Sequence, residues 1–512
     1  MAKMQQQVVY WGQNALEIAS KLPGYADFYQ VDHDVTPSKV LSDTYRNALF
    51  LLGSDAAVWQ EPAWFAKLPA NAILYDSRSS LSAAIQALAT LKNAQPLDFS
   101  DLDRLAHVIH YDYFPGQWAF KLAYDTLRIA PDFQGEVSEN AGTSTVIQGD
   151  FGGQWTPLAT WVQMTWSYGD WYETFYPECT ADAGVDVRFL VRIVEIESGR
   201  LIASKILAAN QSKAGLPFYV GKKSANIMVS VQARGNGTIT LGRMHINRSR
   251  ENYGHLFVGG RLISDPHELA QGVASYFDAG DMKPPLMVYF SGYHIAESFE
   301  GNFLMRAFHT PFLLISDNRL VGGAFYFGSD DLERQIADVI QDTLNRLRFR
   351  PKDLILVGQS MGSTGALYYG AQLTPAGIVV SKPLPDVGTI ANEGRLNRPN
   401  DFEPIMDIVN KLAGGDSPQE IAGLNERFWT QFKKGDLART ILGIVYMQQD
   451  DYQPDGFARI YHDLANQNAH VQLLHKGIPG RHTDPAPNVI QSVIKIARLI
   501  LAESFKRKGA ND

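Results

Sequence analysis

The sequence predicts an α/β protein of three regions: an N-terminal Rossmann-like α/β region, an inserted central β-sandwich and a C-terminal α/β domain. Strand-like apolar runs alternate with helical patterns at both ends of the chain, whereas the middle holds β-branched and aromatic runs with little helical periodicity. A chain of 512 residues also exceeds one ordinary hydrophobic core. We therefore expect domains at residues 1–145, 146–250 and 251–512.

The amino-acid composition and net charge exclude some classes of protein. Apolar residues make up 45% of the chain and charged residues 20%, which is typical of a globular protein. A formal net charge of -8 argues against nucleic acid as a ligand. The single cysteine, Cys179, allows no intramolecular disulfide and fits a reducing compartment. The first residues lack the apolar core of a signal peptide, and no run reaches the roughly 18 apolar residues that span a bilayer. We expect a cytoplasmic protein.

The N-terminal region is predicted to consist of parallel α/β units. Its strand-like runs are VVYW, NALFLLGS and NAILYDS, and its helical runs are NALEIASKL and SLSAAIQALATL. No glycine-rich nucleotide-binding motif follows Gly12. His107, His110 and Asp112 are close in sequence, but this pattern is more typical of a helix end than of a metal site. We expect neither a bound cofactor nor a metal.

The central region is predicted to form antiparallel hairpins. Its strand-like runs are VDVRFLVRIVE, LIASKIL, ANIMVSVQA and TITLGRMHI, with turn residues such as ESGR and RGNG between them. Residues 155–178 also concentrate Trp155, Trp161, Trp166 and Trp171. Aromatic rings fill sandwich cores and also stack on sugar rings. Core packing and a glycan- or partner-binding surface both stay open for this segment.

The most informative motif lies in the C-terminal region, in DLILVGQSMGSTGALYYGAQL. A buried strand precedes Gly358-Gln359-Ser360-Met361-Gly362 and a helix follows it, which is the context of a G-x-S-x-G nucleophile elbow. The two glycines allow the strand and the helix to pack closely around a strained serine. The motif predicts an α/β-hydrolase domain with Ser360 as nucleophile and the Met361 amide as first oxyanion donor.

The partners of the nucleophile are expected further along the chain, the acid first and the histidine second. Four histidines follow it: His462, His470, His475 and His482. We favour His482 over His475 as the base, because His475 ends the strand VQLLH whereas His482 lies in the loop GIPGRHTDPAP before the final helix and can reach back over the serine. The acid should follow the strand ILGIVYMQ, where Asp450 or Asp451 could orient the imidazole. Two adjacent side chains do not easily face the same ring, and we rank Asp450 slightly first.

A second oxyanion donor is expected in the loop after the strand LMVYF. The candidates are Ser291, Gly292 and Tyr293, and no lipase-like HGGG segment is present. The loop is predicted, and the choice among its three residues stays open.

The whole chain resembles the accessory Sec system proteins of the second accessory-secretory-protein family. The resemblance rests on GQSMGS at 358–363, YMQQDDY at 446–452 and the order of the three regions. It implies a cytoplasmic protein, with peripheral association at the membrane, that joins other accessory secretory proteins and the accessory Sec translocase to export a serine-rich-repeat glycoprotein adhesin. It also implies O-acetylation of N-acetylglucosamine on that adhesin. The nucleophile carries over to Ser360 and the base to His482, while the acid stays open between the two aspartates.

The resulting hypothesis is a serine-dependent O-acetyltransferase with no bound cofactor, in which a sugar hydroxyl attacks an acyl-enzyme. The sequence does not indicate the acetyl donor. One alternative is a carboxylesterase or deacetylase-type serine hydrolase, and another is a non-catalytic scaffold of the export complex.

Overall fold

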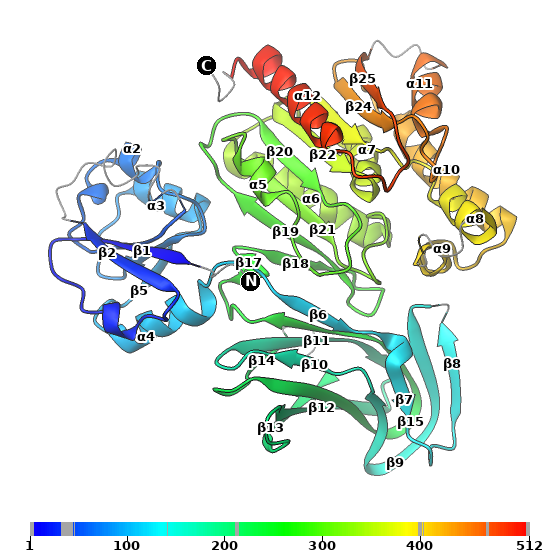
Figure 1. Cartoon of the computed structure of the whole chain (residues 1–512), viewed down its shortest axis with the longest axis horizontal. Coiled ribbons are helices and arrows are strands. Elements are labelled where there is room, and N and C mark those ends of the chain that lie inside the picture. Colours follow the sequence, from blue (N-terminus) through cyan, green and yellow to red (C-terminus); the bar gives the residue numbers. More distant parts are fainter. Residues whose placement is uncertain are drawn as a thin grey trace.

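The computed structural model describes residues 5–31, 45, 47–140, 142–209, 215–397, 402, 404–466 and 471–507. His470, one of the four histidines considered above, lies outside them. Figure 1 shows three regions built on separate sheets: the N-terminal α/β region in blue, an antiparallel sheet in cyan to green, and a mixed sheet with its helices in green to red. Within the described residues, no helix combines the length and apolarity needed to cross a membrane.

The N-terminal region is a five-stranded parallel sheet in the order β2-β1-β3-β4-β5. Its strands are β1 (Gln6–Trp11), β2 (Ala26–Val31), β3 (Leu49–Leu52), β4 (Ile73–Asp76) and β5 (Gln95–Leu97). Helices α2 (Pro62–Phe65) and α3 (Ala83–Leu91) cover one face, and α4 (Leu102–His107) covers the other. Alternate residues of β1 enter the two cores, Val9 one and Val8 the other, because successive strand side chains point to opposite faces. The predicted parallel α/β region is confirmed.

The central region is one ten-stranded antiparallel sheet around a single apolar core. Its strands are β6 (Ala119–Leu122), β7 (Leu127–Ile129), β8 (Glu136–Asn140), β9 (Ser144–Trp161), β10 (Thr165–Ser167), β11 (Tyr172–Ala181), β12 (Val185–Glu195), β13 (Leu201–Ala208), β14 (Leu216–Tyr219) and β15 (Ala225–Arg248). The first half of β15 pairs with β12 and its second half with β11. Gly235 and Gly237, both with positive φ, lie between the halves and allow the strand to bend.

Strands of the antiparallel sheet already occur before residue 146, the predicted start of the central region. Strands β6, β7 and β8 precede residue 146, yet they pair with β15 or β9 and so belong to the antiparallel sheet. The antiparallel structure was predicted, whereas a separate sandwich domain with limits at 146 and 250 stays a prediction.

The C-terminal region is an eight-stranded mixed sheet in the order β18-β19-β21-β20-β22-β23-β24-β25. Its strands are β18 (Arg261–Ser264), β19 (Gly272–Asp278), β20 (Leu286–Phe290), β21 (Phe312–Asp317), β22 (Leu354–Gln359), β23 (Gly377–Ser381), β24 (Ile441–Met447) and β25 (Gln472–Ile478). The pairs β18–β19 and β19–β21 are antiparallel and the rest are parallel. A short hairpin of β16 (Gly254–His255) and β17 (Phe257–Val258) precedes them.

Helices cover both faces of this mixed sheet. They are α5 (Asn302–Arg306), α6 (Asp330–Leu347), α7 (Met361–Leu373), α8 (Val387–Asn397), α9 (Ile405–Ala413), α10 (Pro418–Lys434), α11 (Gly456–Asn466) and α12 (Pro487–Phe505). One face packs against α6, α7, α8 and α10, and the other against α5 and α12. The central strands are buried on both sides, which explains their uninterrupted apolar sequences.

Candidate active site

The sharp turn between β22 and α7 holds the predicted nucleophile. Ser360 has φ 53° and ψ -121°, a strained conformation of the kind that recurs at functional sites. The neighbouring glycines are required by close packing, since a Cβ at Gly358 would lie 2.0 Å from the carbonyl oxygen of Gly362. A Cβ at Gly362 would lie 2.1 Å from the carbonyl oxygen of Phe290 in β20. The strand–turn–helix arrangement predicted from the motif is therefore present.

Three side chains form a continuous hydrogen-bonded chain at this turn. The Ser360 Oγ lies 2.8 Å from Nε2 of His482. The Nδ1 of the same ring lies 2.9 Å from Oδ2 and 3.2 Å from Oδ1 of Asp450. Both the His482 and Asp450 side chains are about 5% exposed, so their contact is shielded from water. This is the spatial order of a nucleophile, a base and an orienting acid.

The geometry distinguishes the two adjacent aspartates. Asp450 faces the imidazole, and its Oδ1 also accepts the backbone N–H groups of Tyr452 at 3.0 Å and Gln453 at 3.1 Å. Asp451 instead accepts the backbone N–H of His482 at 3.0 Å. Asp450 therefore occupies the acid position, and Asp451 holds the loop that carries the histidine. His475 lies in β25 beside the ring of Phe457.

Two neighbours of the histidine were not identified from the sequence. The ring of Tyr452 stacks on the imidazole of His482 with centroids 4.4 Å apart and planes at 4°. Lys382 follows β23 and donates from Nζ to the carbonyl oxygen of His482 and, at 3.5 Å, to that of Asp484. Burial lowers the pKa of Lys382, and the nearby carboxylates partly oppose this shift. The available signals were weak: a tyrosine after the aspartate pair and a lysine directly after a buried strand.

The predicted oxyanion donors are only partly compatible with the structure. The Ser291 N–H donates to the Ile315 carbonyl oxygen at 2.9 Å, as part of the sheet. The Gly292 N–H donates to Oε2 of Glu300 at 2.9 Å. The two amides are engaged in this conformation, which corrects the expectation that either points at the reacting carbonyl. Met361, at the start of α7, and Tyr293 stay predictions.

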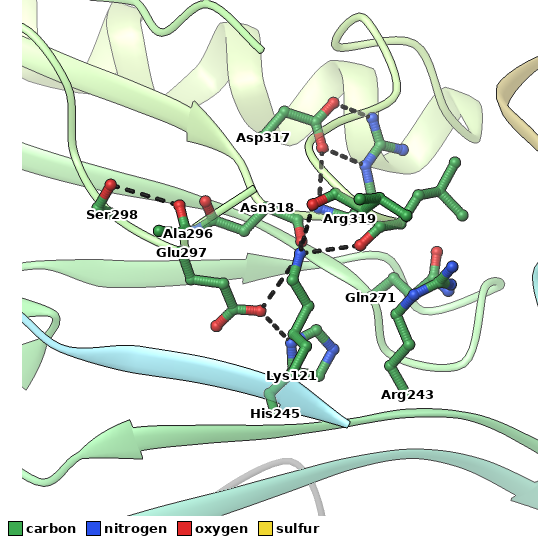
Figure 2. A network of polar contacts seen from close by, with 12 residues as sticks. Lys121, Arg243, His245, Gln271, Ala296, Glu297, Ser298, Asp317, Asn318 and Arg319 are labelled. Carbon is green, nitrogen blue, oxygen red and sulfur yellow. Dashed lines mark hydrogen bonds and ion pairs between the residues drawn. The ribbon is translucent and has the colours of Figure 1, made fainter. Parts of the chain in front are cut away.

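The loop after β20 is held by a buried polar network from the antiparallel sheet, which Figure 2 shows at close range. Glu297 of this loop contacts Nδ1 of His245 in β15 and lies 3.7 Å from Nζ of Lys121 in β6. The opposite nitrogen of His245 lies 2.9 Å from Oε1 of Glu178. Lys121 also donates to the carbonyl oxygen of Asn318 at 2.8 Å. The network thus fixes the loop from residues of three different strands.

The charge state of this network follows from its burial. Burial alone would lower the pKa of His245, but the carboxylates of Glu297 and Glu178 outweigh it and raise the pKa to about 9. Burial opposes ionisation of Glu178, yet the hydrogen bond with His245 and the attraction of its charge lower the pKa of Glu178 to about 2. At neutral pH a buried imidazolium therefore lies between two carboxylates.

The tryptophan-rich segment is partly buried in the core and partly exposed at the surface. Trp161 is buried in the core of the antiparallel sheet. Trp155 stacks under the guanidinium groups of Arg188 and Arg234, at 4.2 and 4.7 Å from its ring centre. Trp166 is 47% exposed on β10. Core packing thus explains part of the segment, and its surface role stays a prediction.

Comparison with known proteins places the chain in a family. A family model described as the accessory Sec system GspB-transporter matches residues 15–507. An accessory Sec system protein of Staphylococcus aureus is 38% identical over 414 residues, 81% of this chain and 78% of the relative. One of Streptococcus gordonii is 36% identical over 420 residues, 81% of each chain. In the solved Glycosylation Associate Protein (Gap123) complex from Streptococcus agalactiae, one chain is 28% identical with a TM-score of 0.87, covering 99% of this chain and 100% of that chain. The chain therefore belongs to the accessory Sec system GspB-transporter family.

Proposed function

We propose that the chain is a serine-dependent O-acetyltransferase of the α/β-hydrolase type that works within the accessory Sec export system. The observation that carries this proposal is the hydrogen-bonded chain from Ser360 through His482 to Asp450. The acceptor we propose is N-acetylglucosamine on a serine-rich-repeat glycoprotein adhesin. A carboxylesterase or deacetylase would use the same three side chains with water as acceptor.

The geometry supports a two-step transfer. His482 Nε2 takes the proton of the Ser360 hydroxyl as its Oγ attacks the carbonyl carbon of an acetyl ester or thioester. The tetrahedral oxyanion collapses, and the leaving group departs with the proton from the imidazolium. A sugar hydroxyl then attacks the acetyl-serine and gives its proton to the imidazole, which returns it to the serine oxygen. Asp450 holds the Nδ1–H tautomer throughout and stabilises the imidazolium.

Family membership supports a place in an assembly. A relative of this chain was solved as part of a complex of glycosylation-associated proteins. We extend this to the present chain and propose that it binds other accessory secretory proteins and, through them, the accessory Sec translocase at the inner face of the membrane. In this proposal the protein is cytoplasmic.

The proposal is tested in cells that export the adhesin. Intact mass spectrometry of the exported glycans is compared between cells with the natural protein and cells with Ser360→Ala. Loss of acetyl groups with continued secretion is the expected result. Unchanged acetylation would remove the acyltransferase proposal and favour a scaffold or an unrelated esterase. Loss of secretion together with acetylation would contradict separable catalytic and export roles.

A further inference from the structure

A cavity of about 630 Å³ lies beside the nucleophile elbow. Its wall includes Gly358 and Gln359, the two residues before the nucleophile, together with parts of β20, α5 and α12. Its volume is within the range of about 300–1,000 Å³ common for small-molecule sites. The mechanism above assigns no role to this cavity.

The polar part of the cavity offers hydrogen bonds to a neutral ligand. Glu300 lines the cavity and is exposed to solvent, and its carboxylate also accepts the Gly292 N–H through Oε2 at 2.9 Å. The hydroxyl of Ser381 also lines it, is fully buried, and has no hydrogen-bond partner in the described structure. The amide of Gln359 adds a group that can both donate and accept. A buried hydroxyl without a partner is costly, so a ligand that bonds to Ser381 would relieve that cost.

The rest of the wall is largely apolar. Tyr289 and Phe299 form its buried aromatic part. Phe303 on α5 is 90% exposed, and Ile490 on α12 is 48% exposed. Among the described residues that line the cavity, none is a lysine, arginine or histidine, and one is a carboxylate. This charge pattern disfavours a ligand that carries phosphates.

We propose that this cavity binds the carbohydrate acceptor of the acyl transfer. A pyranose ring has hydroxyl groups at its edge for carboxylate, amide and hydroxyl partners, and an apolar face that stacks on an aromatic ring. The inference rests on the proposed function, because it assigns the acceptor to a cavity lined by Gly358 and Gln359, the two residues before Ser360.

The loop that presents Glu300 is held rigidly, as a preformed site requires. The amide of Gln117 donates to the carbonyl oxygen of Phe299 at 3.0 Å and accepts its N–H at 2.9 Å. The Ser316 hydroxyl donates to the carbonyl oxygen of Ser298 at 2.7 Å. The Glu297 carboxylate is fixed by the buried network of Figure 2. The residues directly before Glu300 therefore have little freedom.

Binding is measured apart from catalysis, on full-length protein carrying Ser360→Ala. The probe is a synthetic serine-rich peptide bearing N-acetylglucosamine, titrated calorimetrically. In this background Phe303→Ala is expected to weaken binding by about 5- to 10-fold through loss of an aromatic face. Ile490→Ala should weaken it by a smaller factor. The matched control is Leu499→Ala. Leu499 lies on α12, the helix of Ile490, is 40% exposed and is outside the cavity.

The outcomes separate this inference from the proposed function. Equal affinity in the Phe303→Ala and control proteins, or no binding of the glycopeptide, would overturn the assignment. Binding of acetyl-coenzyme A that depends on Phe303 would give the cavity to the donor and overturn it as well. Formation of acetyl-Ser360 from a small ester, followed by mass spectrometry, tests the nucleophile without using the cavity. That reaction can succeed while the acceptor assignment fails.

Discussion

Replacing Asp450 by asparagine should nearly abolish catalysis without disturbing the fold. The asparagine oxygen can keep the contacts that Oδ1 now makes with the backbone N–H groups of Tyr452 and Gln453. Its amide NH₂ would then take the place of the oxygen that lies 2.9 Å from Nδ1 of His482. A donor at that position requires Nδ1 to be unprotonated, so the ring proton moves to Nε2. That nitrogen lies 2.8 Å from Ser360 Oγ and could no longer accept the serine proton.

The expected loss is about 10⁴-fold in kcat, the size associated with the wrong imidazole tautomer in a serine triad. A factor of 10⁴ corresponds to about 5.5 kcal/mol of transition-state stabilisation. The His482 and Asp450 side chains are nearly buried, so water cannot easily replace the lost acceptor and the 10⁴-fold loss should not be reduced. Asp451→Asn changes the charge by the same amount one residue away. It keeps an oxygen for the backbone N–H of His482, so the loss should stay below about 10-fold.

The assay is the acylation rate with p-nitrophenyl acetate, followed by the release of nitrophenol. Circular dichroism and thermal unfolding establish that both variants are folded. A loss for Asp451→Asn that equals or exceeds that for Asp450→Asn would refute the assignment of the acid. Equal and small losses for both would show that Asp450 does not set the tautomer of the imidazole.

Three further changes test other parts of the site. Gly362→Ala places a Cβ 2.1 Å from the Phe290 carbonyl oxygen and should reduce acylation by at least about 100-fold. The control is Gly423→Ala, whose Cβ would have no atom within 4 Å and should leave acylation unchanged. Ester turnover measures both variants. Lys382→Met removes the cation that holds the loop of His482 and should slow acylation by about 10- to 100-fold. Unchanged labelling by a fluorophosphonate would contradict this. The pKa of His245 is raised to about 9. The stabilisation of the fold by its protonated ring is therefore complete below pH 6.5 and is lost as the pH rises through 9. Thermal unfolding should therefore show an alkaline loss of stability that is absent in His245→Gln, and the same slope in both proteins would contradict the linkage.

Sequence reasoning worked where structure is determined locally. The nucleophile elbow depends on five consecutive residues, and both glycines have the close contacts that the motif implied. Alternating apolar strands and helices also predicted the α/β character of both ends, because a strand that is buried on two faces has apolar residues at successive positions. The position of His482 followed from the order of elements and the loop before the last helix.

Sequence reasoning was less complete where contacts join distant residues. Whether Asp450 or Asp451 meets the imidazole depends on a turn whose backbone amides bind one carboxylate, and neighbouring aspartates look alike in sequence. Ser291 was a reasonable oxyanion donor until the strand order placed its amide against Ile315. Gly292 is engaged by a carboxylate eight residues away. Such pairings become visible only when the sheet is assembled.

The antiparallel sheet supports the loop that lies beside the candidate active site. The loop of residues 291–301 leaves β20 beside the nucleophile and receives its fixed contacts from outside the mixed sheet. Glu297 is buried, and without His245 and Lys121 its carboxylate would lose the charges that offset its desolvation. A buried, uncompensated carboxylate would force the loop to move outward. Ser360, His482 and Asp450 therefore lie in one region of the chain, but the shape of the surface beside them depends on contact with the antiparallel sheet.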